Sequence, residues 1–238
     1  TNQDNDAGFT ITETDGGTSV SESGTTDKFI VVLDKQPLGD VVLTFTSADT
    51  DEVTVSPASI TFTTDNWNDT THGEVTVTGQ NDNIIDGSTE TVITVSVDQN
   101  NSHHGYDHVA DKTVTVTTTD NDTASLVLST GTLSITEGST DTFTVKLSAQ
   151  PSDNVVLTVA SSETAQATIS PQTITFTSAN WNNATHGTVT VTAVDDSIVD
   201  GNVDVTISIT AASSDTDFNG KAGSVTVTTT DNDTPEIN

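Results

Sequence analysis

Apolar and small polar residues alternate along most of the chain. Thr113–Thr118 reads TVTVTT and Ser224–Thr229 reads SVTVTT, a period of two that places valine on one face of a strand and threonine on the other. Branched β-carbons fit the pleated surface of a strand, which strengthens the prediction. Ten further runs predict strands: Phe29–Leu33, Val41–Thr46, Ile60–Thr63, Val75–Thr78, Val92–Val97, Phe143–Leu147, Val155–Val159, Ile174–Thr177, Val189–Thr192 and Val205–Ile209.

The residues between these runs indicate turns. Gly, Asp, Asn and Pro separate the strands, and no stretch has the 3.6-residue period of an amphipathic helix. Seven or more short strands in roughly 110 residues are typical of an antiparallel sandwich of immunoglobulin-like type. We therefore predict an all-β fold.

The pattern occurs twice. Ser56–Gly79 and Ser170–Ala193 are identical at 16 of 24 positions and lie 114 residues apart. A second marker, Asp-Asn-Asp, occurs at residues 4–6, 120–122 and 231–233. Such internal repetition indicates tandem domains. We predict two complete sandwiches at residues 7–122 and 123–233, with the end of a preceding repeat at 1–6 and the start of a following one at 234–238.

The junction between the two predicted domains is short. Asp120-Asn121-Asp122 leads directly into a strand near Leu126–Leu128, without the Gly/Ser tether that would let domains tumble. We expect an extended rod cut from a longer array, with neighbouring repeats as partners and the fragment itself monomeric.

The charge balance limits the possible partners. The chain has 35 Asp and Glu against 5 Lys and Arg, a net charge of −30, and no cysteine. Phosphate binding needs basic side chains, so nucleic acid and anionic membrane are excluded as partners. No apolar run approaches the roughly 18 residues of a membrane span. Multivalent cations, or screening by salt, must offset the self-repulsion.

Acidic residues recur at equivalent strand ends in the two copies. Calcium prefers six to eight oxygen ligands, and segments two strands apart return to the same end of a sandwich. The sequence therefore favours a calcium site over the alternative of a solvated acidic rim. The recurring acids are Glu22 with Glu137, Asp49 with Glu163, Asp82 with Asp195 and Asp196, Asp86 with Asp200, and Asp120 and Asp122 with Asp231 and Asp233.

These acids, in this order, resemble the Calx-β family, which occurs in tandem in large bacterial surface adhesins of RTX type. The segments TFTTDNWN and TFTSANWN, which begin at Thr61 and Thr175, are similar to the bacterial variety. The resemblance implies that calcium binds at the loop end of each sandwich. The implied ligands are Glu22, Asp49, Asp82, Asp86, Asp120 and Asp122 in the first copy, and Glu137, Glu163, Asp195, Asp196, Asp200, Asp231 and Asp233 in the second.

The chain departs from the family pattern at several places. Asn81 and Asn83 replace acids, and Asp86 and Asp200 are shorter than the usual glutamate. Asn121 and Asn232 interrupt the closing acidic triplet. The number of ions for each repeat therefore stays open.

Aromatic and histidine residues offer other chemistry. Trp67 and Trp181 occupy equivalent positions and are interpreted as core or corner anchors rather than as sugar-stacking platforms. His103, His104 and His108 cluster near Tyr106 in the first copy only, where loop histidines are favoured over a zinc or nickel site. No nucleophile elbow, phosphate loop or dinucleotide fingerprint occurs, so we predict no enzyme.

The sequence thus predicts a calcium-stabilised spacer of a secreted, extracellular bacterial adhesin, which holds a distal binding domain away from the cell surface. Two alternatives stay open. One is a module that itself binds carbohydrate, ice or another cell. The other is a passive, salt-adapted stalk without specific calcium.

Overall fold

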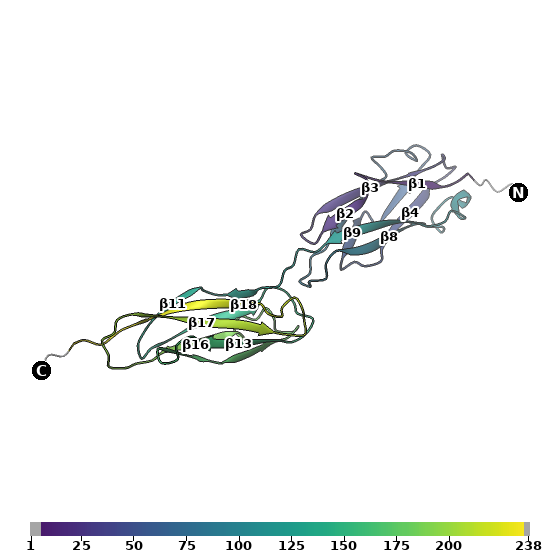
Figure 1. Cartoon of the computed structure of the whole chain (residues 1–238). Coiled ribbons are helices and arrows are strands. Elements are labelled where there is room, and N and C mark those ends of the chain that lie inside the picture. Colours follow the sequence, from purple (N-terminus) through teal and green to yellow (C-terminus); the bar gives the residue numbers. More distant parts are fainter. Residues whose placement is uncertain (1–5, 236–238) are drawn as a thin grey trace. The chain divides into compact units, whose positions relative to one another are not determined.

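The computed structural model describes residues 6–235, which form two compact units (Figure 1). The first unit runs to Asp82 and continues from Asp86 to Asn121. The second comprises Asn83–Ile85 and the chain from Asp122 onward. Of the flanking-repeat remnants predicted at 1–6 and 234–238, only residues 6, 234 and 235 lie inside the described range.

The first unit is a sandwich of two sheets. One sheet has the strand order β1-β3-β7-β5 and the other the order β2-β9-β8-β4-β6. The strands are β1 (Phe9–Glu13), β2 (Thr18–Ser21), β3 (Thr26–Leu33), β4 (Val41–Ser47), β5 (Val53–Ser56), β6 (Ser59–Phe62), β7 (Glu74–Gly79), β8 (Thr89–Val97) and β9 (Lys112–Thr119).

The second unit repeats this topology. Its sheets have the orders β10-β12-β16-β14 and β11-β18-β17-β13-β15, so the prediction of two tandem all-β sandwiches is confirmed. The strands are β10 (Leu126–Leu128), β11 (Thr132–Thr136), β12 (Thr140–Leu147), β13 (Val155–Ser161), β14 (Ala167–Ser170), β15 (Thr173–Phe176), β16 (Thr188–Ala193), β17 (Val203–Ala212) and β18 (Ala222–Thr230).

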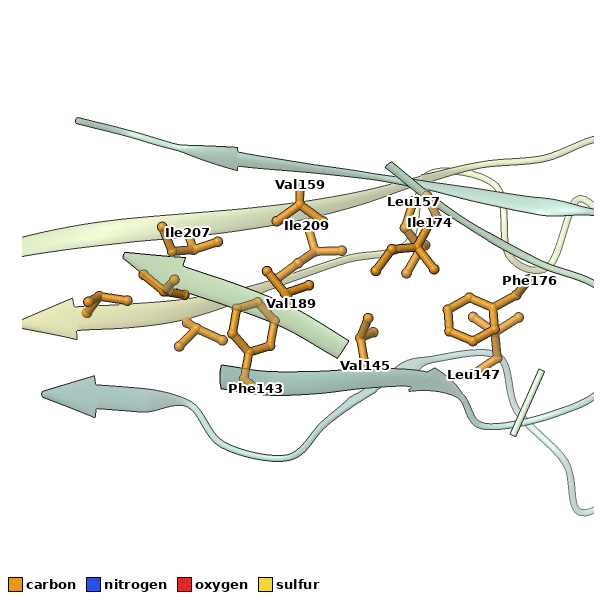
Figure 2. Close-up of a cluster of buried hydrophobic side chains, with 14 of the residues drawn as sticks. Phe143, Val145, Leu147, Leu157, Val159, Ile174, Phe176, Val189, Ile207 and Ile209 are labelled. Carbon is orange, nitrogen blue, oxygen red and sulfur yellow. The ribbon is translucent and has the colours of Figure 1, made fainter. Parts of the chain in front are cut away.

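Alternation along the strands builds the two cores. In β17 every second residue from Val205 to Ala211 is buried and the residues between are exposed. Figure 2 shows the result in the second unit, where Phe143, Leu157 and Ile207 converge from different strands. Trp67 and Trp181 are half-buried against the first and second cores, respectively. Their carbonyls accept hydrogen bonds of 2.9 Å from Leu33 and Leu147, as corner anchors would.

One strand pair in each unit departs from the antiparallel arrangement. The first strand region divides: β1 pairs with β3 in one sheet, and β2 runs parallel to β9 in the other. In the second unit β11 likewise runs parallel to β18. Parallel strands end on the same side of a sheet. The pairing therefore places Glu22 next to Asp120, and Glu137 next to Asp231, one residue beyond each pair of strand ends.

Helix is nearly absent between residues 6 and 235. The one helix there is η1, a 3-10 turn at His104–Tyr106. No helix in the described part is long and apolar enough to cross a membrane.

Candidate metal centre

A buried glutamate follows the parallel strand in the first unit. Glu22 is only 2% exposed, and its backbone N–H continues the ladder to the carbonyl of Thr119 at 3.2 Å. Its carboxylate accepts a hydrogen bond from the Asn121 backbone N–H at 3.2 Å. The parallel pair thus fixes the carboxylate at the sheet end, against the segment that follows β9.

The loop between β7 and β8 brings further acids to the same end. The backbone N–H groups of Asp86 and Gly87 donate to Oδ2 of Asp120, at 3.1 and 2.9 Å. These two bonds hold the loop against the end of β9. Asp82, four residues earlier in the loop, lies near enough to Glu22 to raise the pKa of that carboxyl.

Glu52 joins this cluster, and the sequence did not predict it. Carboxylate oxygens of Glu22, Glu52 and Asp86 lie within 4.8 Å of one another, and Thr89 Oγ1 donates to Glu52 at 2.9 Å. The second copy has Gln166 at the equivalent position. A search for acids that recur in both copies therefore passes over Glu52. Its place one residue before β5, at the site end of the unit, is the signal that would have found it.

Burial and mutual repulsion act on these carboxyls. Burial raises the pKa of Glu22, the Asn121 N–H opposes that rise, and the nearby charges of Asp120, Asp82 and Asp86 add to it. Burial also raises the pKa of Asp86, together with the charges of Asp82 and Asp120. The cluster is therefore costly to ionise without a compensating cation.

The second unit holds an equivalent cluster. Carboxylate oxygens of Glu137, Asp231 and Asp233 lie within 4.8 Å of one another. Glu137 is 4% exposed. Asp231 accepts hydrogen bonds of 2.8 Å from the backbone N–H groups of Gly201 and Asp233, as Asp120 does from Asp86 and Gly87 in the first unit.

The electrostatics of this second cluster are also unfavourable. Burial raises the pKa of Glu137, and the charges of Asp196, Asp231 and Asp200 raise it further. Burial raises the pKa of Asp233 as well, with contributions from Asp231, Asp195, Asp196 and Asp200. Asp231 differs, because the N–H groups of Asp233 and Gly201 lower its pKa.

Two carboxylate oxygens in this cluster are left without a donor. Glu137 Oε2 and Asp233 Oδ2 are buried and have no hydrogen-bond partner among residues 6–235. A buried, unpaired carboxylate oxygen is unfavourable, and a cation is the partner that would satisfy both of these. The donor set consists of oxygens only, which suits calcium and not a metal that prefers nitrogen or sulfur.

The asparagines that interrupt the acidic triplets have a structural role. The side-chain amide of Asn121 donates to Asn81 Oδ1 at 3.0 Å. That of Asn232 donates to Asp195 Oδ1 at 3.0 Å and to the Glu137 carbonyl at 3.2 Å. An ionised aspartate cannot donate. These asparagines therefore tie the closing segment to the loop without adding charge.

Two predicted ligands lie in neighbouring turns. Asp49 accepts a hydrogen bond from the Asp51 N–H at 3.0 Å, and Glu163 accepts one from the Ala165 N–H at 3.3 Å. Neither belongs to a group of three clustered carboxylates in the described part of the chain, and their role as ligands stays a prediction. So does that of Asp122, the residue at which the second unit begins; its counterpart Asp233 lies in the second cluster.

The histidines of the first unit do not gather around a common point. His104 Nδ1 lies 2.9 Å from Asp107, and no histidine occurs in any group of three potential ligands between residues 6 and 235. Tyr106 is buried and donates from its hydroxyl to the Lys35 carbonyl at 2.7 Å. This loop closes the end of the sandwich opposite to Glu22.

Comparisons with known proteins show similarity of architecture only. No protein-family model matches the chain, and no curated protein sequence matches it. Domains 4 and 5 of the S-layer protein SbsC are 17% identical over 93% of this chain and 97% of theirs, with a TM-score of 0.34. CBD12 from CALX1.2 is 11% identical over 92% and 99%, with a TM-score of 0.35. Fibronectin(III)-like modules of Clostridium thermocellum CbhA are 12% identical over 96% and 100%, with a TM-score of 0.26.

Proposed function

We propose that each unit binds calcium at the Glu22 or Glu137 end, and that the chain is a spacer segment of a secreted bacterial surface adhesin. The observation that carries the calcium proposal is Glu137. Its carboxylate is almost fully buried, is surrounded by aspartates that raise its pKa, and has an oxygen without a donor. A bound divalent cation would attract each of these carboxylates, offset their mutual repulsion and supply the partner that the Glu137 oxygen lacks.

Repetition supports the spacer role. Both units have the same strand order and the same buried glutamate after the parallel strand. A function that depends on one specialised site would need features in one copy that the other lacks. Similar repeats in series instead serve to lengthen a protein. We propose that this length holds a binding domain away from the cell surface.

Calcium would make the stability of the spacer depend on its surroundings. Extracellular calcium modules have dissociation constants of roughly 10⁻⁴–10⁻³ M. A ligand at about 100 times its dissociation constant stabilises the folded state by about 2.7 kcal/mol. The units would therefore be stable outside the cell and weaker in calcium-poor cytosol.

A thermal melt tests the proposal. The chain is heated in calcium, in magnesium and in EDTA at constant ionic strength, and we expect calcium alone to raise the midpoint by about 10 °C. Each unit holds one of the two tryptophans. Trp67→Phe leaves Trp181 to report on the second unit by fluorescence, and Trp181→Phe leaves Trp67 for the first.

Equal midpoints in all three buffers would contradict calcium binding and favour the passive, salt-screened stalk. A rise in one unit only would restrict the site to that unit. Because the ionic strength is constant, screening of the net charge does not contribute to the difference.

A further inference from the structure

The second unit includes a short apolar segment from the β7–β8 loop. Asn83–Ile85 belongs to this unit, where the Gln150 N–H donates to the Asn83 carbonyl at 2.7 Å and Ile84 forms a parallel bridge with Gln150. Ile85 packs against the hydrophobic core of the same unit. A main-chain pairing and the partly buried side chain of Ile85 therefore hold this segment in place.

Hydrogen bonds to a buried carboxylate hold the surface that receives this segment. The hollow there is lined by Ile84, Ile85, Gln150, Pro151, Ser152 and Asp215 among others. Asp215 is 6% exposed and accepts hydrogen bonds from the backbone N–H groups of Ser152 and Asp217, at 2.8 and 2.9 Å. The buried carboxylate thus fixes the rim formed by the β12–β13 loop.

The second unit has its own copy of the apolar segment. Ile198 and Val199 are the counterparts of Ile84 and Ile85, 114 residues further along the chain. Their side chains are 61% and 51% exposed. Two adjacent, branched apolar side chains at a loop tip are costly to leave in water.

The first unit has a hollow around the equivalent Gln-Pro pair. A cavity of about 130 Å³ is lined by Lys35, Gln36, Pro37, Leu38, His103 and Tyr106 among others. Gln36-Pro37 is the counterpart of Gln150-Pro151. Leu38, on its rim, is 86% exposed. Leu38, Ile198 and Val199 are the most exposed large apolar side chains in the described part of the chain.

We propose that the Ile198–Val199 segment docks into the Gln36–Leu38 hollow of a second copy of this chain. The contact would repeat the one that Ile84 and Ile85 make within the second unit. Lys35 lines the hollow and supplies one cation for Asp196 or Asp200, which flank the segment. The inference rests on the proposed spacer function only in taking another repeat as the partner.

NMR spectra of mixtures of two variants test the docking. The variants are chosen so that only one chain can donate the apolar segment and only the other can receive it. The ¹⁵N-labelled receiver carries Ile198→Asp and Val199→Asp, and the unlabelled donor carries Leu38→Asp. All three positions are at least half exposed, so the variants retain the fold. With donor at about 1 mM, a range suited to weak untethered contacts, we expect concentration-dependent shifts at Gln36, Leu38 and His103–Tyr106.

Two further donors serve as controls. Unlabelled Ile198→Asp/Val199→Asp chain should produce no shifts. A Leu38→Asp donor that also carries Val127→Asp, a change at another exposed apolar position, should produce the same shifts as the first donor. Absent shifts, shifts at other surfaces, or equal shifts with the Ile198→Asp/Val199→Asp donor would overturn the proposal. Calcium-dependent melting of the Leu38→Asp chain, in which the loop of Asp196 and Asp200 is unchanged, tests the metal site separately.

Discussion

At the residue scale, the molecule is organised around two buried glutamates. Glu22 and Glu137 each follow the strand that runs parallel to the last strand of the unit, and each is less than 5% exposed. A buried carboxylate surrounded by other carboxylates is destabilising unless a cation compensates it. The same side chain should therefore destabilise the calcium-free unit and stabilise the calcium-bound one.

Glu137→Gln should separate these two effects. In EDTA we expect the Trp181 midpoint to rise, because the substitution removes a buried charge that Asp196, Asp231 and Asp200 repel. In calcium we expect the ion-dependent rise to fall by about half or more, because a ligand charge is lost. The measurement is the single-tryptophan melt of the Trp67→Phe background.

Glu163→Gln is the matched control in the same unit. Glu163 is exposed and accepts one bond from the Ala165 N–H. If the ion binds only the clustered carboxylates, this variant leaves the calcium-dependent rise unchanged. An effect equal to that of Glu137→Gln would show that Glu163 is a ligand, as the family resemblance implies, and would enlarge the site.

At the element scale, turns and strand ends position the site and the core. The Thr-His-Gly turn before β16 is one example, and it recurs before β7. His186 Nε2 lies 2.9 Å from the Thr175 carbonyl, and its ring packs edge-on against Phe176 with centroids 5.3 Å apart. The Gly187 carbonyl accepts a hydrogen bond of 2.9 Å from the Val145 N–H. The turn thus presses the start of β16 against β12.

Gly187→Ala should be strongly destabilising. A Cβ at this position would lie 1.7 Å from the Val145 carbonyl oxygen, so the backbone of β12 or β16 must move. We expect a loss of about 2–4 kcal/mol in the free energy of unfolding, as for other severe steric substitutions. Urea denaturation followed at Trp181 measures the loss.

Gly131→Ala provides the comparison. A Cβ at Gly131 meets no atom within 4 Å, so we expect its stability to stay within about 0.5 kcal/mol of the parent. Similar losses for the two variants would contradict the close approach of the Gly187 turn to β12.

At the scale of the whole molecule, acidity dominates. The chain has a net charge of −30, so its acidic side chains repel one another. The repulsion is strongest within the two acidic clusters. Four clustered carboxyls bind protons more tightly in the folded chain than in the unfolded one, because their pKa values are raised: Glu22, Asp86, Glu137 and Asp233. The calcium proposed above would therefore compete with protons for the same oxygens.

The pH dependence should change sign with calcium. Without calcium, the folded state binds more protons than the unfolded state, so its stability should rise as the pH falls from neutrality toward the ordinary carboxyl pKa values of 3.8 and 4.5. With calcium, protonation displaces the ion, and stability should fall over the same interval. Melts in both conditions measure the two slopes.

Stability should fall again at still lower pH in either condition. Hydrogen bonds lower the pKa of Asp27, Asp98 and Asp215 below the ordinary 3.8. Their contribution is lost as pH falls through these lowered values. A calcium-free chain that loses stability steadily from pH 7 downward would contradict the raised pKa values of the clusters.

The amino-acid sequence by itself determined the strands, their faces and the repetition. The alternation of apolar and polar residues indicates which side chains are buried, as in β12 and β17, because neighbouring residues in a strand point to opposite faces. Two matching segments 114 residues apart determined that there are two similar units. Acids at equivalent strand ends located most members of each cluster, from Glu22 to Asp120 in the first copy.

Only the tertiary structure decided which strands and loops are neighbours. The period of two does not distinguish a parallel edge pair from an antiparallel one, so β2 beside β9 was not predictable. Glu52 was missed because only the fold brings the start of β5 to the same end of the unit as Glu22. No acid occurs at the equivalent position of the second copy, so a comparison of the two copies does not find it. The assignment of Asn83–Ile85 to the second unit depends on contacts between residues far apart in sequence. Burial and packing determine these contacts, and no local pattern encodes them.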